Sequence, residues 1–256
     1  MIEKHKYSII KSPLRVGLIR LFLFLACLSI LGAQKQEEIP MLDIQFRVYA
    51  DDPAKHLRYL NPDGEVVKVN DSSVPSKPLK FYSGLSETYE YNGPAPLYFF
   101  YERPAPTEEN PNAVERRLAA KAKIPTKWDE VLLIFFPKES AEGELPQYNV
   151  YPLNDSEKAL PKSHIKLFNA SGIKLVGKIG DDTFPVPGGP TEAYEIEQAT
   201  KVVLAIAEGR GNRQAYMDTI RLNKNQRAYL ILLPPFFSKS TEIQYRLLRD
   251  DRTPEE

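Results

Sequence analysis

The stretch LDIQFRV, residues 42–48, alternates apolar with polar side chains. A period of two with one polar face is typical of a β-strand that buries one side. Similar short segments recur along the chain, separated by turn signals such as Asn61–Gly64 (NPDG) and Asn92-Gly93, in which proline and glycine favour tight turns. We expect about fourteen short strands, a number in the range of β-sandwiches and β-barrels.

One later segment departs from this alternation. Residues Ala228–Leu233 are apolar almost without interruption, and such a run indicates a strand that is buried on both faces. The sequence Pro234-Pro235-Phe236-Phe237 ends the run. Because proline has no backbone N–H, it stops strand pairing there and protects an edge.

The spacing of the strands predicts an all-β protein made of two Ig-like β-sandwich domains, since helices are missing between the strands. We assign residues 39–138 to the N-terminal domain and residues 146–250 to the C-terminal domain, because the stretch between them is polar and poor in apolar residues. A boundary near residue 160 fits nearly as well. No strong sequence repeat relates the two halves.

Residues 103–127 differ from their surroundings. A proline-rich loop, 103–111, precedes Asn112–Lys123, which is rich in strong helix formers and ends before Pro125. Asn112 is a favourable N-cap, and proline ends a helix. The sequence therefore predicts one short helical insertion between two strands of the N-terminal domain.

The first 33 residues have the pattern of a secretory signal peptide. Five basic residues precede an apolar run, Leu21–Ala33, that ends in the small pair Gly32-Ala33. The run is short for a membrane span, which needs about 20 residues. We therefore expect cleavage after Ala33 and export to the periplasm or cell surface. An uncleaved anchor and lipidation at Cys27 are the alternatives, and only these would bring the protein into contact with a membrane.

Composition excludes several classes of function. The whole chain has no formal net charge, but residues 34–256 hold 29 Lys and Arg against 33 Asp and Glu, a net charge of −4. Such a surface does not attract a phosphate backbone, so we expect no nucleic-acid partner. Cys27 is the single cysteine. The mature chain therefore has no disulfide, no cysteine nucleophile and no thiolate metal site.

No motif supports a catalytic, cofactor or metal site. Residues Gly172–Ile179 come within one position of a phosphate-binding loop, but Ile179 lacks the hydroxyl that would bind magnesium, and the segment alternates like a strand. We expect no nucleotide. His56 and His164 lie far apart in sequence, without the spacing of zinc ligands. The acidic pairs lie at strand ends, where aspartate favours turns.

Aromatic residues are the most suggestive surface feature. They crowd the strand Leu97–Glu102, where alternation must direct either Phe99 and Tyr101 or Tyr98 and Phe100 outward. Outward rings can stack on sugars or contact an apolar partner surface, and the alternative is that they belong to the core. The candidate partner-binding residues are Tyr98, Phe99, Phe100, Tyr101 and Trp128.

A short segment resembles a known group of proteins. Leu160-Pro161 leads into Ile165–Asn169, followed by Ala170-Ser171 and a short hairpin around Gly177. This pattern, over about 30 residues, is similar to one in uncharacterised exported β-sandwich proteins of Verrucomicrobia-type bacteria. The resemblance implies fold and export, and no activity.

The overall plan is also similar to that of periplasmic pilus chaperones, which have a leader and two Ig-like domains. Arg103-Pro104 and Lys166 do not match the basic anchor residues of that family. We therefore do not transfer its function to this chain.

Taken together, these features predict a non-catalytic binding or structural module of the bacterial cell envelope, whose partner is an envelope protein or a polysaccharide. A carbohydrate-active enzyme or sugar-binding protein is one alternative, and a chaperone-like factor that donates or accepts a β-strand is another. An enzyme needs a pocket with convergent carboxylates, a binder shows a flat aromatic patch, and a strand acceptor shows an unpaired edge strand at a cleft.

Overall fold

The computed structural model describes residues 39–251, apart from 53, 72, 140–143, 198, 209–210, 238–239 and 241. The predicted signal peptide, residues 1–33, and Cys27 lie outside the described residues. Over the described part the protein is all-β, with 16 strands and no helix. The described residues therefore include no helix long and apolar enough to cross a membrane. The strands are β1 (Met41–Ala50), β2 (Arg58–Leu60), β3 (Ser76–Pro78), β4 (Tyr89–Pro94), β5 (Leu97–Pro104), β6 (Val114–Ala122), β7 (Glu130–Pro137), β8 (Tyr148–Asn154), β9 (His164–Asn169), β10 (Leu175–Ile179), β11 (Asp182–Val186), β12 (Gly189–Glu195), β13 (Ala199–Glu208), β14 (Gly211–Arg221), β15 (Arg227–Leu233) and β16 (Gln244–Asp250).

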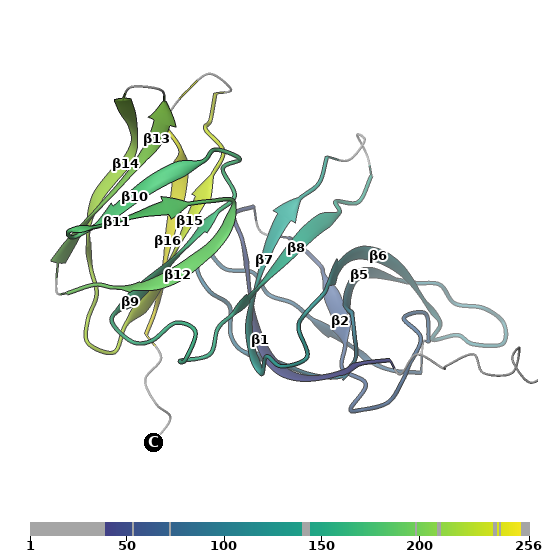
Figure 1. Cartoon of the computed structure of the whole chain (residues 1–256). Helices are drawn as coiled ribbons and strands as arrows, with labels where there is room; N and C mark the ends of the chain where they lie inside the picture. The colour runs from purple at the N-terminus through teal and green to yellow at the C-terminus, as the bar shows by residue number, and fades with distance from the viewer. Residues whose placement is uncertain are drawn as a thin grey trace, which may run out of the picture. The chain divides into compact units, whose positions relative to one another are not determined.

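The two halves of the chain have the same strand order. The first eight strands form sheets of order β4-β1-β7-β8 and β3-β2-β5-β6, and the last eight form sheets of order β12-β9-β15-β16 and β11-β10-β13-β14. Adding eight to each number of the first pair gives the second pair. The equivalent pairs β1–β7 and β9–β15 are both parallel. We call these groups the first and the second sandwich (Figure 1).

Each sandwich has its own apolar core between its two sheets. In the first, the rings of Phe46, Tyr59, Phe99 and Phe135 pack edge to face. Such aromatic contacts bury large apolar areas and add stability beyond the area itself. The second core is mainly aliphatic and includes Val202, Leu204 and Leu230 among its fully buried members.

A third cluster joins the two sandwiches through the sheets that contain β7 and β15. Leu132 and Ile134 of β7 share it with Tyr229 and Ile231 of β15. The central strands β7 and β15 are therefore buried on both faces over most of their length, and every residue of β15 is buried. This confirms the prediction from the continuous apolar run, whose pattern is the one expected of a strand without a solvent face.

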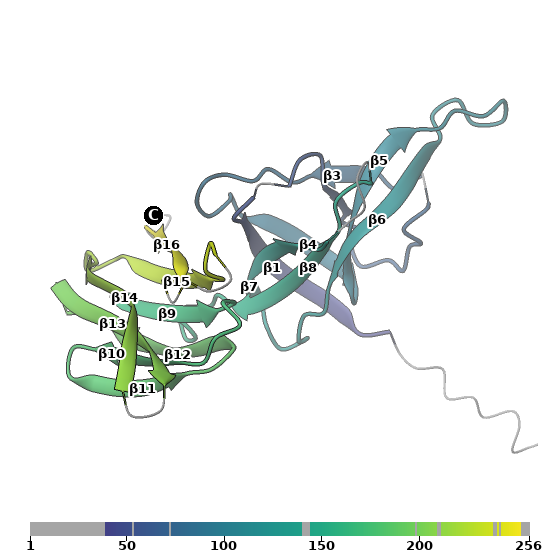
Figure 2. The same cartoon turned by 90° about the horizontal axis from the view of Figure 1, so that it is seen from above.

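The predicted helix within 103–127 is wrong. Val114–Ala122 forms strand β6, which pairs with β5 in a long hairpin (Figure 2). The ladder is bulged at Ala119, and Ala120 and Ala122 pack into the core of the first sandwich. Helix propensity differs between residues by less than about 1 kcal/mol, so the burial and pairing available at this sheet edge decide the conformation.

Strand β8 belongs to the first sandwich, because it pairs along its length with β7. The first sandwich therefore extends to Asn154, and residues 155–163 connect it to β9. The polar stretch 138–146 separates β7 from β8 within one sheet. The connection between the sandwiches lies close to the alternative boundary near residue 160.

Candidate functional site

On one side of the first sandwich, the outermost strands of its two sheets approach each other. β6 is the outermost strand of one sheet and β8 the outermost strand of the other. The two strands lie beside each other (Figures 1 and 2), and a cavity of about 480 Å³ opens between them. We call it the β6–β8 cleft. Its lining residues are Leu118, Ala119, Ala120, Lys121, Lys123, Lys138, Gln147, Tyr148, Asn149, Val150, Tyr151 and Pro152.

The cleft is basic. Lys121, Lys123 and Lys138 line it, and its described lining contains no aspartate or glutamate. All three lysines are exposed, and none forms an ion pair with another described residue within 4.0 Å. Unpaired cations around a concave surface attract anionic groups. The cleft is therefore suited to a ligand with negative charge.

The rim of the cleft is apolar. Leu118 of β6 is 47% exposed and Tyr151 of β8 is 46% exposed, although both are large apolar side chains. The floor is formed by small residues, Ala119 and Ala120, which leave room above the core. A ligand that lies in the cleft would cover apolar surface as well as meet the lysines.

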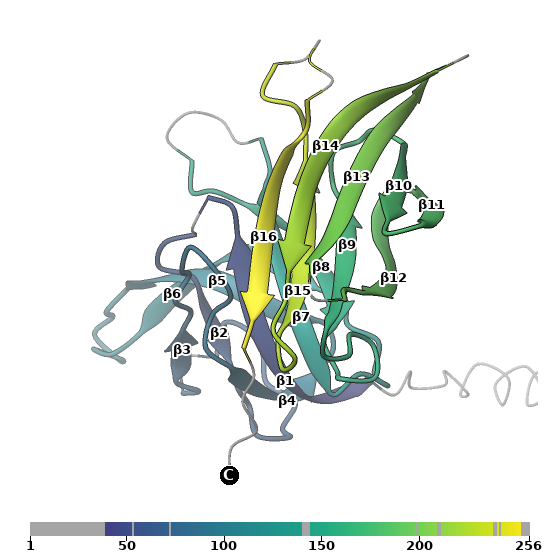
Figure 3. The same cartoon turned by 90° about the vertical axis from the view of Figure 1, so that its left-hand side faces the viewer.

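The equivalent side of the second sandwich is lined differently. There β14 and β16 are the outermost strands of the two sheets (Figure 3). The rings of Tyr216 on β14 and Tyr245 on β16 meet edge to face, with centroids 4.6 Å apart. Tyr216 is buried in the core of that sandwich. An aromatic contact thus links the two outermost strands there, whereas lysines and alanines line the cleft between β6 and β8.

A second cavity of about 580 Å³ adjoins the cleft at Tyr148, which lines both. We call it the charged cavity. It contains residues of both signs, among them His56, which adopts a positive φ of 62°. Its other lining residues are Asp52, Lys55, Tyr101, Glu102, Arg103, Glu115, Arg117, Leu145 and Pro146.

Two of the three carboxylates that line the charged cavity, Glu102 and Glu115, are bound to arginine, and the third is Asp52. Glu102 accepts hydrogen bonds from Arg116 Nε at 2.9 Å and from Ser76 Oγ at 2.8 Å. Burial opposes ionisation of Glu102, but these hydrogen bonds outweigh it, so the pKa of Glu102 lies below its ordinary value. Glu115 is paired with Arg103. Carboxylates held ionised by arginine are poor general acids near neutral pH.

Two of the predicted partner-binding aromatics are inaccessible. Phe99 and Phe100 are both fully buried. Phe99 faces the core, as alternation allows, and Phe100 faces the other side of the sheet, where the loop that contains Val67 and Val69 covers it. The guanidinium of Arg116 lies 5.2 Å from the Phe100 ring. The outward side chain of this strand is buried by a loop that the alternation pattern does not reveal.

The other three predicted aromatics lie in different places. Tyr101 packs partly against the core, lines the charged cavity and donates a hydrogen bond to the carbonyl of Pro146 at 3.0 Å. Tyr98 is half-buried on the opposite face of the sheet, beside Phe100. Trp128 is half-buried against the core. The structure therefore does not gather the five residues on one surface, and only Tyr101 lines the charged cavity or the β6–β8 cleft.

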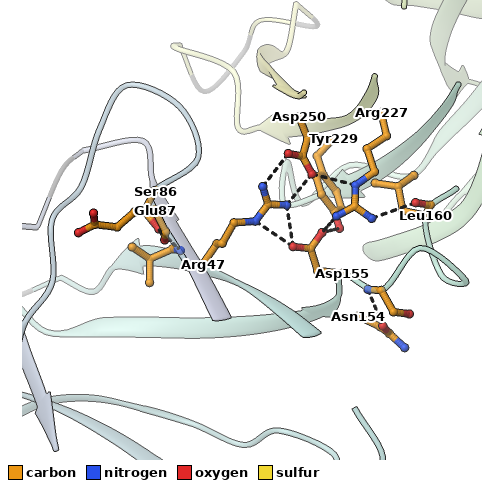
Figure 4. A network of polar contacts seen from close by, with 11 residues as sticks. Arg47, Ser86, Glu87, Asn154, Asp155, Leu160, Arg227, Tyr229 and Asp250 are labelled. Carbon is orange, nitrogen blue, oxygen red and sulfur yellow. Dashed lines mark hydrogen bonds and ion pairs between the residues drawn. The ribbon is translucent and has the colours of Figure 1, made fainter. Parts of the chain in front are cut away.

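A buried network of charges lies between the two sandwiches (Figure 4). Arg47 of β1 contacts Asp155 at 2.6 Å and Asp250 of β16 at 2.8 Å, and Arg227 of β15 contacts the same two carboxylates, each at 2.8 Å. The hydroxyl of Tyr229 also donates to Asp155 at 2.8 Å. Each guanidinium bridges both carboxylates, which is the arrangement that stabilises buried charge.

This network is structural in character. Burial opposes ionisation of Asp250, but the hydrogen bond from Arg47 and the charges of both arginines outweigh it, so the pKa of Asp250 lies below its ordinary value. The sequence offers one signal for this network, because the charged residue Arg227 is the first residue of β15, directly before the apolar run Ala228–Leu233. Arg47 alone reads as an ordinary residue on the polar face of its strand, and its partners are more than 100 positions away.

Within the described residues, no group of three or more His, Cys, Asp or Glu side chains is arranged to hold a metal ion. Comparison of the sequence with models of protein families gives no match, and a search of curated proteins also gives none.

Proposed function

We propose that the chain is a non-catalytic binding module of the bacterial cell envelope, exported to the periplasm or cell surface, which holds its ligand in the β6–β8 cleft. The observation that carries this proposal is the different lining of the equivalent sides of the two sandwiches. Where the second sandwich places Tyr216 against Tyr245, the first has a cavity lined by Lys121, Lys123 and Lys138. Three exposed lysines that form no ion pair with a described residue, beside exposed apolar side chains, stabilise a fold poorly and serve a ligand well.

The charged cavity supports binding over catalysis. Glycoside hydrolysis needs one carboxylic acid that stays protonated near neutral pH and a second free carboxylate. Glu102 is instead held ionised by Arg116 and Ser76, and Glu115 is paired with Arg103. The charged cavity adjoins the cleft and adds charged side chains of both signs to its lining.

We further propose that each sandwich is Ig-like and that the first 33 residues are a cleaved signal peptide. Two four-stranded sheets enclose each core, which supports the first of these proposals. The basic start, the apolar run and the small residues before Gln34 support the second.

A crosslinking experiment in cells that express the full chain tests the binding proposal. A photo-reactive amino acid is placed at Leu118 on β6 and, as the matched control, at Met217 on the equivalent strand β14. The two positions are 47% and 46% exposed, so random collisions should label them equally. We expect Leu118 to capture one dominant envelope component and Met217 to capture none. Equal capture at both positions, or capture at neither, would overturn the proposal.

A further inference from the structure

The β6–β8 cleft carries neutral hydrogen-bonding groups as well as charge. Gln147 and Asn149 line it and are exposed, and neither side-chain amide is hydrogen-bonded to another described residue. A side-chain amide both donates and accepts hydrogen bonds. The lining therefore combines amides with the cations of Lys121, Lys123 and Lys138, which suits a ligand that carries both hydroxyl and anionic groups.

An aromatic ring in a fixed position completes the lining. Tyr151 is 46% exposed, and the centroid of its ring lies 5.6 Å from the centroids of both Phe136 and Phe168. These two contacts hold the ring in place, so a ligand meets a preformed apolar surface and has fewer side chains to order on binding. An exposed tyrosine ring of this kind packs well against the apolar face of a sugar.

Neither strand beside the cleft offers a regular edge to another protein strand. The ladder of β6 is bulged at Ala119, and β8 contains Pro152, which has no backbone N–H. The two strands also lie close together. A ligand that is recognised through its own side groups, and needs no backbone ladder, fits these edges better than an added strand does.

We propose that the β6–β8 cleft binds an anionic polysaccharide, whose carboxylate or sulfate groups meet the three lysines and one of whose sugar rings packs on Tyr151. This inference rests on the proposed function, since it names the ligand of the same cleft. The volume of the cleft, about 480 Å³, lies within the usual range of ligand sites, about 300–1,000 Å³.

The charged cavity allows the ligand to be a polymer. It adjoins the cleft at Tyr148 and has a volume of about 580 Å³. Lys55 and Arg117 line it, and neither forms an ion pair with another described residue within 4.0 Å; Asp52 is the lining carboxylate that no arginine holds. A chain that fills the cleft can therefore continue past Tyr148 and meet further cations.

Titration of the full chain with defined polysaccharides tests this inference. The anionic probes are polygalacturonate and dextran sulfate, and their neutral counterparts are fully methyl-esterified polygalacturonate and dextran. We expect at least one anionic probe to bind and both neutral polymers to fail, and the two probes distinguish carboxylate from sulfate. Failure of both anionic probes, or equal binding of a neutral counterpart, would overturn the proposal.

Variants of the lysines locate the binding site. The double variant Lys121→Ala/Lys123→Ala should weaken binding about tenfold or more, because charge complementarity is lost. The control variant Lys201→Ala/Lys224→Ala removes two exposed lysines of the second sandwich and should bind as the unmodified chain does. Equal affinities of the two double variants would place the polysaccharide outside the cleft and overturn the proposal.

Polyglutamate separates sugar recognition from charge attraction alone. Tyr151→Ala should weaken binding of the polysaccharide and leave any binding of polyglutamate unchanged. Tyr82→Ala is the matched control, since Tyr82 is 47% exposed and lines neither cavity. Polyglutamate that binds as tightly as the polysaccharide, with no effect of Tyr151→Ala on either, would overturn recognition of a sugar.

The outcomes also distinguish this inference from the binding proposal on which it rests. If Leu118 captures an envelope protein in cells while neither anionic polysaccharide binds, the binding module stands and the polysaccharide is rejected. If Leu118 captures nothing and both polysaccharides also fail, both proposals are rejected.

Discussion

The two sandwiches share one strand order and differ in the side chains between the outermost strands of their sheets. In the second sandwich, Tyr216 extends the core toward β16 and meets Tyr245. In the first, alanines and lysines line a cleft between β6 and β8. The comparison shows that one strand order can carry different surfaces, because a few side chains on the outermost strands decide whether this side holds an aromatic contact or a basic cleft.

The buried charge network joins the two sandwiches, so its loss should produce the largest effect on stability. In Arg47→Met, Asp155 and Asp250 lose the guanidinium of Arg47 and keep their ion pairs with Arg227. Removing one member of a buried ion pair costs about 3–5 kcal/mol. We expect the free energy of unfolding in urea to fall by that amount. The fluorescence of Trp128, the single tryptophan, reports on the first sandwich, and far-UV circular dichroism reports on both.

The matched control is Arg246→Met. Arg246 also links the halves of the chain, through Asp51, but its side chain is 42% exposed. Exposed ion pairs contribute less than about 1 kcal/mol, so this variant should lose little. Equal losses in the two variants would show that the buried network adds nothing beyond an ordinary surface pair, and that the sandwiches are held together by the apolar cluster alone.

Acid should weaken the connection between the sandwiches. The pKa of Asp250 lies below its ordinary value of 3.8 in the folded protein, so the unfolded chain takes up the proton first as pH falls. The stabilising contribution of Asp250 is fully present above pH 3.8 and is lost as pH falls through its lower folded pKa. We expect unfolding free energies measured from pH 6 to pH 2 to fall more steeply for the unmodified chain than for Asp250→Asn. Identical slopes would contradict this assignment.

The second sandwich is tightly packed at Gly177 of β10. A Cβ at this position would lie 2.7 Å from the ring of Phe184, which in turn stacks on Tyr194 with centroids 4.0 Å apart. The ring cannot retreat without moving its neighbour, so Gly177→Ala should cost about 1–3 kcal/mol through overpacking. Gly84→Ala is the control, because nothing lies within 4 Å of a Cβ there. Thermal unfolding of the two variants measures the difference, and equal melting temperatures would contradict the prediction.

The sequence predicts the fold class well because the patterns concerned are local. Alternation in 42–48 and the apolar run 228–233 indicate strands that are half-buried and fully buried, and β1 and β15 have these patterns. The helix predicted for Asn112–Lys123 was wrong. The alanines and lysines of this segment favour a helix locally, but pairing with β5 decides its conformation. Helix propensity is too weak to resist such a contact.

The candidate site was largely hidden from sequence reasoning for a related reason. Lys121 lies in β6, Lys123 directly after β6, and Lys138 directly after β7 of the other sheet, and their grouping depends on β6 and β8 being outermost. The repeat of strand order was hidden as well, since the two halves share topology without a strong sequence repeat.

The smallest expected effect concerns Tyr216, the buried tyrosine of β14 in the second sandwich. Among the described residues, the hydroxyl of Tyr216 is the buried side-chain atom without a hydrogen-bond partner. An unsatisfied buried hydroxyl carries a desolvation penalty, so Tyr216→Phe should leave stability unchanged or raise it by up to about 1 kcal/mol. In the first sandwich, the Tyr91 hydroxyl donates to the carbonyl of Pro94 at 2.6 Å, and Tyr91→Phe should lower stability by about 1 kcal/mol. Urea unfolding of both variants compares them. A loss in Tyr216→Phe as large as that in Tyr91→Phe would show that the hydroxyl of Tyr216 stabilises the second sandwich, and that the packing of its ring against Tyr245 does not account for its whole contribution.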